Sequence, residues 1–433
     1  MLMVAFIFKP WVNMIVSSGA VPRVLADDIL VAASGDDHKS SFVEAFHATL
    51  QYIKDIGATV APDKSYLIST NRVTRKSLRV MQWPSLNHAR IPVKLHVRDL
   101  GTHICTTEGK AANTLSRRVH QAIATLTRVR RANYPFSMKA HICRTLVLPG
   151  SLYGVEACDI PRHLVSKLRS SLARATNKGS TFQCNAIMFQ VASYGIDLDP
   201  CAHIALRRVT MLRRYLAKFP SSHSVVDDIM RTYQSMGFVG TSISQLRKDN
   251  TEAWRLPVRG PVGLLLHSLA SFRALMLPTM EVRHAFGSSF NLLTLPCQAL
   301  KRTILDCYCG WRFLDATQSR SEFGAPFLMD QGTLQLALKR CPAEDYRLLV
   351  SILGLGRWNE QRACKFDSNL SPTCQLCHTA EGCLSHLLWD CPRLAQLRSS
   401  SRYDFSAFKV QDIHPLIRYG LPPPMKADLR PEL

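Results

Sequence analysis

Two adjacent carboxylates, Asp27 and Asp28, form the first group of residues suited to chemistry. They lie within residues 21–33, where a short apolar segment flanks them on each side. Neighbouring carboxylates at an apolar turn are costly to bury unless a cation joins them. Carboxylate oxygens suit Mg²⁺, which proteins bind through one or two carboxylates plus substrate phosphates. Asp27 and Asp28 are therefore candidate Mg²⁺ ligands, and an ordinary turn or helix cap is the structural alternative.

The second group is a cysteine and histidine cluster with the pattern Cys374-x2-Cys377-x8-His386-x4-Cys391. A structural Zn²⁺ takes four nitrogen or sulfur ligands in a tetrahedron, and a Cys-x2-Cys turn supplies two of them. His378 and Cys383 lie within the same segment and could replace one ligand. Unpaired thiols in a surface loop are the alternative. Small zinc knuckles contact single-stranded nucleic acid in other proteins.

Most of the fourteen cysteines lie outside this cluster, alone in apolar stretches. The start of the chain lacks the pattern of a secretory signal. We therefore interpret the cluster as a metal site and not as a set of disulfides. The apolar run of residues 1–8 is too short to span a membrane and is expected to be an ordinary buried segment. We expect an intracellular protein, nuclear or cytoplasmic, that is not secreted and has no membrane span.

The elements that must position the two carboxylates make the first hundred residues α+β. Residues 21–33 predict a β-hairpin whose turn carries both aspartates. The apolar spacing over residues 40–57 predicts a helix that ends at Gly57. Residues 59–68 predict a turn and a strand, and residues 91–104 predict a further strand region.

The chain beyond Thr106 becomes helical and strongly basic. The whole sequence carries a net charge of +22, and residues 106–218 contain 18 Lys and Arg against 5 Asp and Glu. Arg117, Arg128 and Arg131 fall on one face of a helix whose opposite face is apolar. Residues 160–178 and 200–218 repeat this pattern. An anionic membrane surface could also attract such a charge, but its spread over several helices favours a folded surface for nucleic acid.

The later part of the chain gives fewer signals. Residues 220–262 predict a linker with short helices, residues 264–277 a packed helix and residues 280–360 further helices. The tail from Arg418 is expected to be disordered. We divide the chain into residues 1–105, 106–219, 220–365, 366–400 with the Cys/His cluster, and a tail of residues 401–433.

Together these residues resemble the reverse transcriptase of a non-LTR retrotransposon. Val24-Leu-Ala-Asp-Asp-Ile-Leu-Val resembles the catalytic hairpin of the polymerase palm, with Leu25 at the usual aromatic position. Residues 57–65, with Lys64, resemble the next palm motif, and residues 99–103, with the sequence Asp-Leu-Gly, resemble the primer grip. Residues 137–154 resemble the thumb, and residues 374–392 resemble the C-terminal zinc knuckle. The likeness covers about residues 20–160 and 370–395.

The resemblance implies a partial polymerase palm in residues 1–105, a helical thumb and connection in residues 106–219, and a zinc knuckle. It implies RNA-directed DNA synthesis by two-metal nucleotidyl transfer in the intact parent. Asp27, Asp28 and Lys64 would be catalytic residues, and both aspartates would hold Mg²⁺. An RNA template and a DNA primer would be the partners, and they would contact Arg117, Arg128, Arg131 and Lys139.

One departure from the family bears on activity. Residues 1–26 contain no Asp or Glu, so the upstream catalytic carboxylate and the fingers have no counterpart. Without them, transition-state charge is less stabilised and a nucleotide is poorly positioned. We therefore expect this chain to be a truncated polymerase that is inactive alone. The missing N-terminal polymerase segment would then be one of its partners.

Two other functions remain open from sequence. The chain could be a non-enzymatic nucleic-acid-binding protein that uses basic helices and a zinc knuckle, with a structural role for the aspartates. It could instead be a helical protein-interaction scaffold with a structural zinc. Steep salt dependence of nucleic-acid binding favours the former, because each phosphate contact releases counterions.

Overall fold

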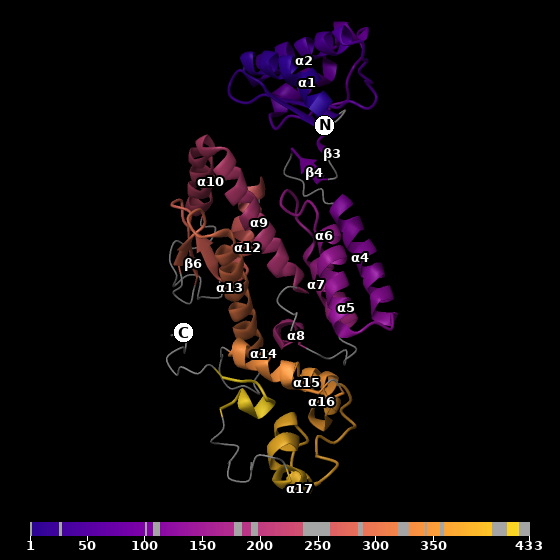
Figure 1. The fold of residues 1–433 in the computed structure, drawn as a ribbon, viewed down its shortest axis with the longest axis vertical. Helices are drawn as coiled ribbons and strands as arrows, with labels where there is room; N and C mark the ends of the chain where they lie inside the picture. Colours follow the sequence, from indigo (N-terminus) through magenta and orange to yellow (C-terminus); the bar gives the residue numbers. More distant parts are fainter. Residues whose placement is uncertain are drawn as a thin grey trace. The chain divides into compact units, whose positions relative to one another are not determined.

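A computed structural model divides the chain into two compact units. One unit comprises residues 1–99 and 104–111, and the other comprises residues 100–103 and 112–433. The described residues are 2–25, 28–99, 102–106, 113–176, 184–191, 198–236, 260–284, 289–318, 329–342, 344–355, 359–400 and 414–423. Figure 1 shows small sheets and many helices, which confirms the α+β class. The division into five segments stays a prediction.

The first unit contains a hairpin, three α-helices and a further strand. Its elements are α1 (Leu2–Ser17), β1 (Val21–Leu25), β2 (Asp28–Ala32), α2 (His38–Asp55), α3 (Arg72–Val80) and β3 (His96–Asp99). β4 (Thr102–Cys105) begins in the second unit and ends in the first. β1 and β2 pair antiparallel, from Val21 opposite Ala32 to Leu25 opposite Asp28. The predicted hairpin is therefore confirmed, and β3 pairs with β4 in a second sheet.

Alternation of side chains explains how the hairpin packs. Val24, Ile29 and Val31 lie on one face and pack against a small core that includes Trp11 and Ile15 of α1. The Trp11 indole N–H donates to Thr49 Oγ1 on α2 at 3.0 Å, which ties the two helices together. The helix predicted over residues 40–57 is confirmed as α2.

Two expectations for the first unit are wrong. The apolar run at the N-terminus is not an ordinary buried segment, because Met3 is 79% and Phe6 82% exposed on α1. The expected strand in residues 59–68 is reduced to one bridge, between Leu67 and Val93. A turn at Pro62 precedes it, and proline supplies no N–H for strand pairing.

The second unit begins with a helical layer in which α4 packs along α7 (Figure 1). Its helical elements are α4 (Asn113–Arg131), α5 (Phe136–Ile142), the π-helical turn η2 (Cys143–Val147), α6 (Leu148–Ser151) and α7 (Arg162–Thr176). Leu115, Val119, Ala122, Leu126 and Val129 of α4 are buried. Their spacing of three and four residues places them on one helix face. The helical character predicted after Thr106 and over residues 160–178 is thus confirmed at α4 and α7.

A second core joins helices to a three-stranded antiparallel sheet of order β5-β6-β7. Its elements are α9 (Pro200–Lys218), α10 (His223–Ser235), α12 (Gly260–Ala270), β5 (Ala274–Met276), β6 (Glu281–His284), β7 (Ser289–Asn291) and α13 (Cys297–Gln318). The expectation of helices throughout residues 280–360 is wrong at β6 and β7. All three residues of β5 are buried, so no alternating pattern marks this strand.

The third core surrounds the C-terminal part of α13. It is built with α8 (Asn185–Val191), α14 (Gln331–Arg340) and α15 (Tyr346–Leu353). The short helix α16 (Glu360–Cys364) follows in the chain. Leu416, Tyr419 and Leu421 are buried in it. Residues 418–423, the described part of the tail from Arg418, are therefore packed, and the expected disorder is wrong there. None of the described helices has the length and apolar character needed to cross a membrane.

Candidate metal centre and basic surface

Four potential metal ligands converge near the C-terminal end of the second unit. The ligand atoms of Cys374, Cys377, His386 and Cys391 all lie within 4.8 Å of one another. Tetrahedral zinc with sulfur at 2.3 Å and nitrogen at about 2.0 Å separates its ligand atoms by roughly 3.4–3.8 Å. The most distant pair would therefore need to close by only about 1 Å. The set is the one predicted from spacing, and it could hold a zinc ion.

Local backbone structure explains why these spacings work. A tight turn follows Cys374, and it places Cys377 beside Cys374 through the bond from His378 N–H to Cys374 O at 2.8 Å. His386 begins a π-helical turn, η7 (His386–Asp390). The Cys391 N–H donates to His386 O at 2.8 Å across this turn. This hydrogen bond between residues five apart brings the side chains of His386 and Cys391 to the same side of the turn. Such π-helical turns occur frequently at functional sites.

The thiols of the cluster differ in their surroundings. The Thr379 hydroxyl donates to Cys377 Sγ at 3.2 Å. This bond, with one from the Thr379 backbone, lowers the pKa of Cys377 to about 6. The thiolate is the form that binds a metal. Cys391 is fully buried, and burial raises its pKa. A bound cation would offset this cost, because a coordinating thiol is deprotonated.

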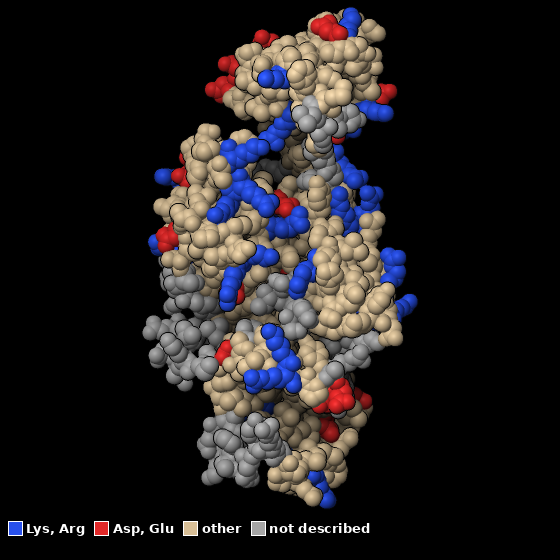
Figure 2. All heavy atoms as spheres, viewed as in Figure 1, with Lys and Arg blue, Asp and Glu red and all other residues tan. Residues whose placement is uncertain are grey.

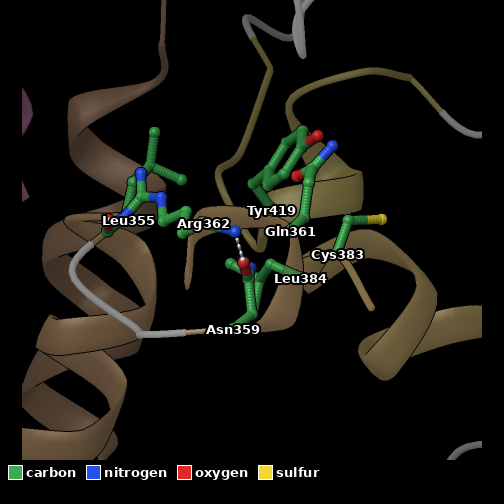
Figure 3. Close-up of a pocket in the computed structure, with 7 residues that line it drawn as sticks. All are labelled: Leu355, Asn359, Gln361, Arg362, Cys383, Leu384 and Tyr419. Carbon is green, nitrogen blue, oxygen red and sulfur yellow. Dashed lines mark hydrogen bonds between the residues drawn. The ribbon is translucent and has the colours of Figure 1, made fainter. Parts of the chain in front are cut away.

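Cys383 and His378, the two alternatives for a ligand, lie outside the four-atom cluster. Cys383 Sγ instead accepts the His386 N–H at 3.3 Å. In Figure 3 its sulfur points away from Asn359 and Arg362. The adjoining pocket offers space of about 20 Å³, which is room for roughly one water molecule. It is too small for a nucleotide, and its lining residues are Leu355, Asn359, Gln361, Arg362, Cys383, Leu384 and Tyr419.

The cluster is attached to the third core and is not an isolated loop. Leu384, between the two pairs of ligands, is buried in that core, and Leu388 packs against it. The Trp389 indole N–H donates to Arg418 O at 2.9 Å. A Cβ at Gly382 would lie 2.9 Å from the Cβ of Glu360, so glycine is needed for this close approach to α16.

Basic side chains gather on the helices of the second unit. Figure 2 shows Lys and Arg over α9 and along α4, and few over the end that holds the Cys/His cluster. Several are exposed and form no ion pair with another described residue; they are Arg117, Arg128 and Arg131 on α4, Arg162, Lys167 and Arg174 on α7, and Arg214 and Lys218 on α9. Their charges are therefore available to an anion.

Lys139 does not share this arrangement. It is only 2% exposed, and its Nζ donates to Arg130 O at 3.0 Å. Its ammonium group therefore stabilises the C-terminal end of α4, and in this conformation it does not face solvent. Arg117, Arg128 and Arg131 keep the exposed positions that the sequence predicted, and Lys139 does not.

The structure describes two of the three candidate polymerase residues, Asp28 and Lys64. Asp28 is exposed at the start of β2, and Lys64 is exposed in the turn after Pro62. Asp27 lies outside the described residues. Among the described residues, no cluster of three or more potential metal ligands includes Asp28.

Sequence reasoning missed two residues that shape these sites. Thr379 supports the Cys377 thiolate, and its position two residues after a ligand cysteine was the available signal. Tyr153 lies beneath the guanidinium of Arg118, with Cζ 5.0 Å from the ring centroid. Nothing in the spacing of residues 118 and 153 marks this contact.

Comparison with known proteins adds no relative. No family model matches the sequence, and no curated protein is significantly similar to it.

Proposed function

We propose that this chain binds nucleic acid through its basic helices, as part of a reverse transcriptase of the non-LTR retrotransposon kind. The observation that carries the proposal is the set of exposed Arg and Lys side chains on α4, α7 and α9 that form no ion pair with another described residue. Phosphate contacts supply most of the affinity in such complexes. The planar guanidinium of arginine can donate two hydrogen bonds to one phosphate, so arginine loses less side-chain entropy per bond than lysine does.

The Cys/His cluster is proposed to hold Zn²⁺ as a zinc knuckle. Four protein ligands would fill the tetrahedron, which is typical of a structural site and not of a catalytic one. The attachment of Leu384 and Trp389 to the neighbouring core supports this role. Zinc would therefore stabilise the end of the helical unit on which the basic surface lies.

The polymerase function rests on the hairpin. β1 and β2 form the two-stranded element that the palm resemblance requires, and Asp28 lies at its tip opposite Leu25. In the proposed parent enzyme, Asp27 and Asp28 would hold Mg²⁺, and Lys64 would contact phosphate or donate a proton. We expect primer extension with Mg²⁺ on an RNA template to fail for this chain alone, because residues 1–26 contain no Asp or Glu that could supply the upstream catalytic carboxylate. Extension that Asp27→Asn abolishes would contradict this expectation.

Nucleic-acid binding is tested by fluorescence anisotropy with an RNA–DNA hybrid at physiological salt. We expect the triple variant Arg117→Gln, Arg128→Gln, Arg131→Gln to bind at least about tenfold more weakly, since each lost phosphate contact weakens binding. The matched control is Arg283→Gln with Arg302→Gln, two arginines that already face Glu281 and Asp306. Equal losses in both variants, or no binding by the wild type, would contradict the proposal.

A further inference from the structure

The turn after α6 presents an exposed tyrosine on a rigid base. Leu152 and Val155 on either side of Tyr153 are buried in the core of α4–α7. Gly154 has a φ of 89°, a left-handed conformation that favours glycine. Because both flanking side chains are anchored, Tyr153 projects from the unit and is 44% exposed.

Further contacts hold this turn in place. The buried guanidinium of Arg208 on α9 donates to Val155 O at 3.1 Å and to Cys158 O at 3.2 Å. Arg207 pairs with Glu156 at 2.7 Å, which neutralises the acidic side chain of the turn. The Tyr153 backbone is therefore fixed by α9 as well as by its own helical layer.

Arg118 of α4 completes the arrangement. Its Nη1 donates to Tyr153 O at 2.9 Å while its Cζ lies 5.0 Å from the Tyr153 ring centroid. The guanidinium is thus held against the ring with its positive charge retained, since Arg118 forms no ion pair within the described chain. The next residue, Arg117, is exposed.

We propose that the Arg118–Tyr153 pair is a stacking site for an unpaired base of single-stranded RNA or DNA. An exposed aromatic ring in basic surroundings is the arrangement that binds single strands, with the base on the ring and the phosphates on the cations. Bases in a duplex are already stacked on their neighbours, so a duplex would gain only the attraction between its phosphates and the basic side chains. This proposal rests on the proposed function, and it specifies that single-stranded nucleic acid binds at this site.

The test compares single-stranded and duplex oligonucleotides of one sequence by fluorescence anisotropy. Tyr153→Leu should weaken single-strand binding by about tenfold, the loss expected for one stacked base, and leave duplex binding within about twofold. Tyr153→Phe should retain single-strand affinity, because the ring remains. Tyr134→Leu is the matched control, since Tyr134 is 52% exposed and lies beyond the opposite end of α4.

A second measurement reports stacking directly. Single-stranded oligonucleotides carrying 2-aminopurine should lose fluorescence on binding to the wild type and much less on binding to Tyr153→Leu. Unchanged single-strand affinity in Tyr153→Leu, or an equal loss in Tyr134→Leu, would overturn the stacking site. Failure of the wild type to bind either form would instead overturn the proposed function.

Discussion

At the scale of single residues, Cys391 and Cys383 have different surroundings although both belong to the cysteine-rich segment. Cys391 is fully buried and contributes to the four-atom cluster, whereas Cys383 Sγ accepts a backbone N–H outside it. We expect Cys391→Ser to lose bound zinc and Cys383→Ser to retain it. Zinc content per chain, measured on purified protein, checks this. Equal zinc loss from both variants would show that the ligand set is wrong.

Arg208 is predicted to contribute strongly to stability. Its guanidinium is buried and bonds to Asp159, Ser268 and three backbone carbonyls. Arg208→Met would remove these bonds and leave Asp159 without its cationic partner, so it should lower the free energy of unfolding by about 3 kcal/mol. Arg207→Met is the control, because its half-exposed pair with Glu156 should contribute less than about 1 kcal/mol. Urea unfolding followed by circular dichroism measures both, and similar losses would contradict the prediction.

His284 should make stability depend on pH. Burial lowers its pKa to about 4, and its Nε2 lies 2.9 Å from Phe272 O. In the unfolded chain its pKa is about 6.5, so the unfolded state binds the proton first as pH falls. Its stabilisation is therefore present above pH 6.5 and is lost between about pH 6.5 and 4, up to roughly 3 kcal/mol.

The measurement for His284 is urea unfolding of the wild type and His284→Phe across this pH range. The difference between the two proteins should change as pH falls from 6.5 to 4 and stay constant above it. A constant difference at every pH would rule out a buried neutral histidine.

At the scale of elements, the metal cluster and the third core should be coupled. Leu384 and Leu388 lie between the ligands and pack on the core that includes α8 and α15. Removal of zinc by a chelator should therefore increase amide hydrogen exchange in these helices as well as in the knuckle. The sheet of β5–β7 belongs to another core and should keep its protection. Exchange that changes only in residues 371–393 would contradict this coupling.

The sequence predicted those elements whose signal is local. α4, α7 and α9 follow from an apolar stripe at helical spacing, and the β1–β2 hairpin follows from two short apolar runs. The strands β5–β7 were missed because they contain three or four residues each and β5 is buried on both faces. Their burial depends on core partners such as α9 and α13 that lie elsewhere in the chain.

The candidate sites show the same distinction. The metal ligands could be chosen from their spacing, because zinc imposes a geometry that few spacings satisfy. The π-helical turn at His386 could not be predicted, since the closure between residues five apart is fixed by the fold around it. Lys139 seemed suited to phosphate, but its burial against Arg130 O depends on how α5 packs. The Arg118–Tyr153 contact joins residues 35 apart.

At the scale of the whole molecule, the net charge of +22 gives the most general prediction. Such a charge attracts polyanions over long distances and is screened by salt. Nucleic-acid affinity should therefore fall steeply as salt rises. The third function considered, a protein-interaction scaffold, predicts no affinity at physiological salt.

We propose that the exposed arginines of α4 contact phosphate. The slope of log affinity against log salt concentration is the direct test of these contacts. For an RNA–DNA hybrid we predict a steep negative slope in the wild type. The triple variant Arg117→Gln, Arg128→Gln, Arg131→Gln should reduce its magnitude by roughly two to three units, close to one unit for each lost contact. An unchanged slope in the triple variant would contradict the account.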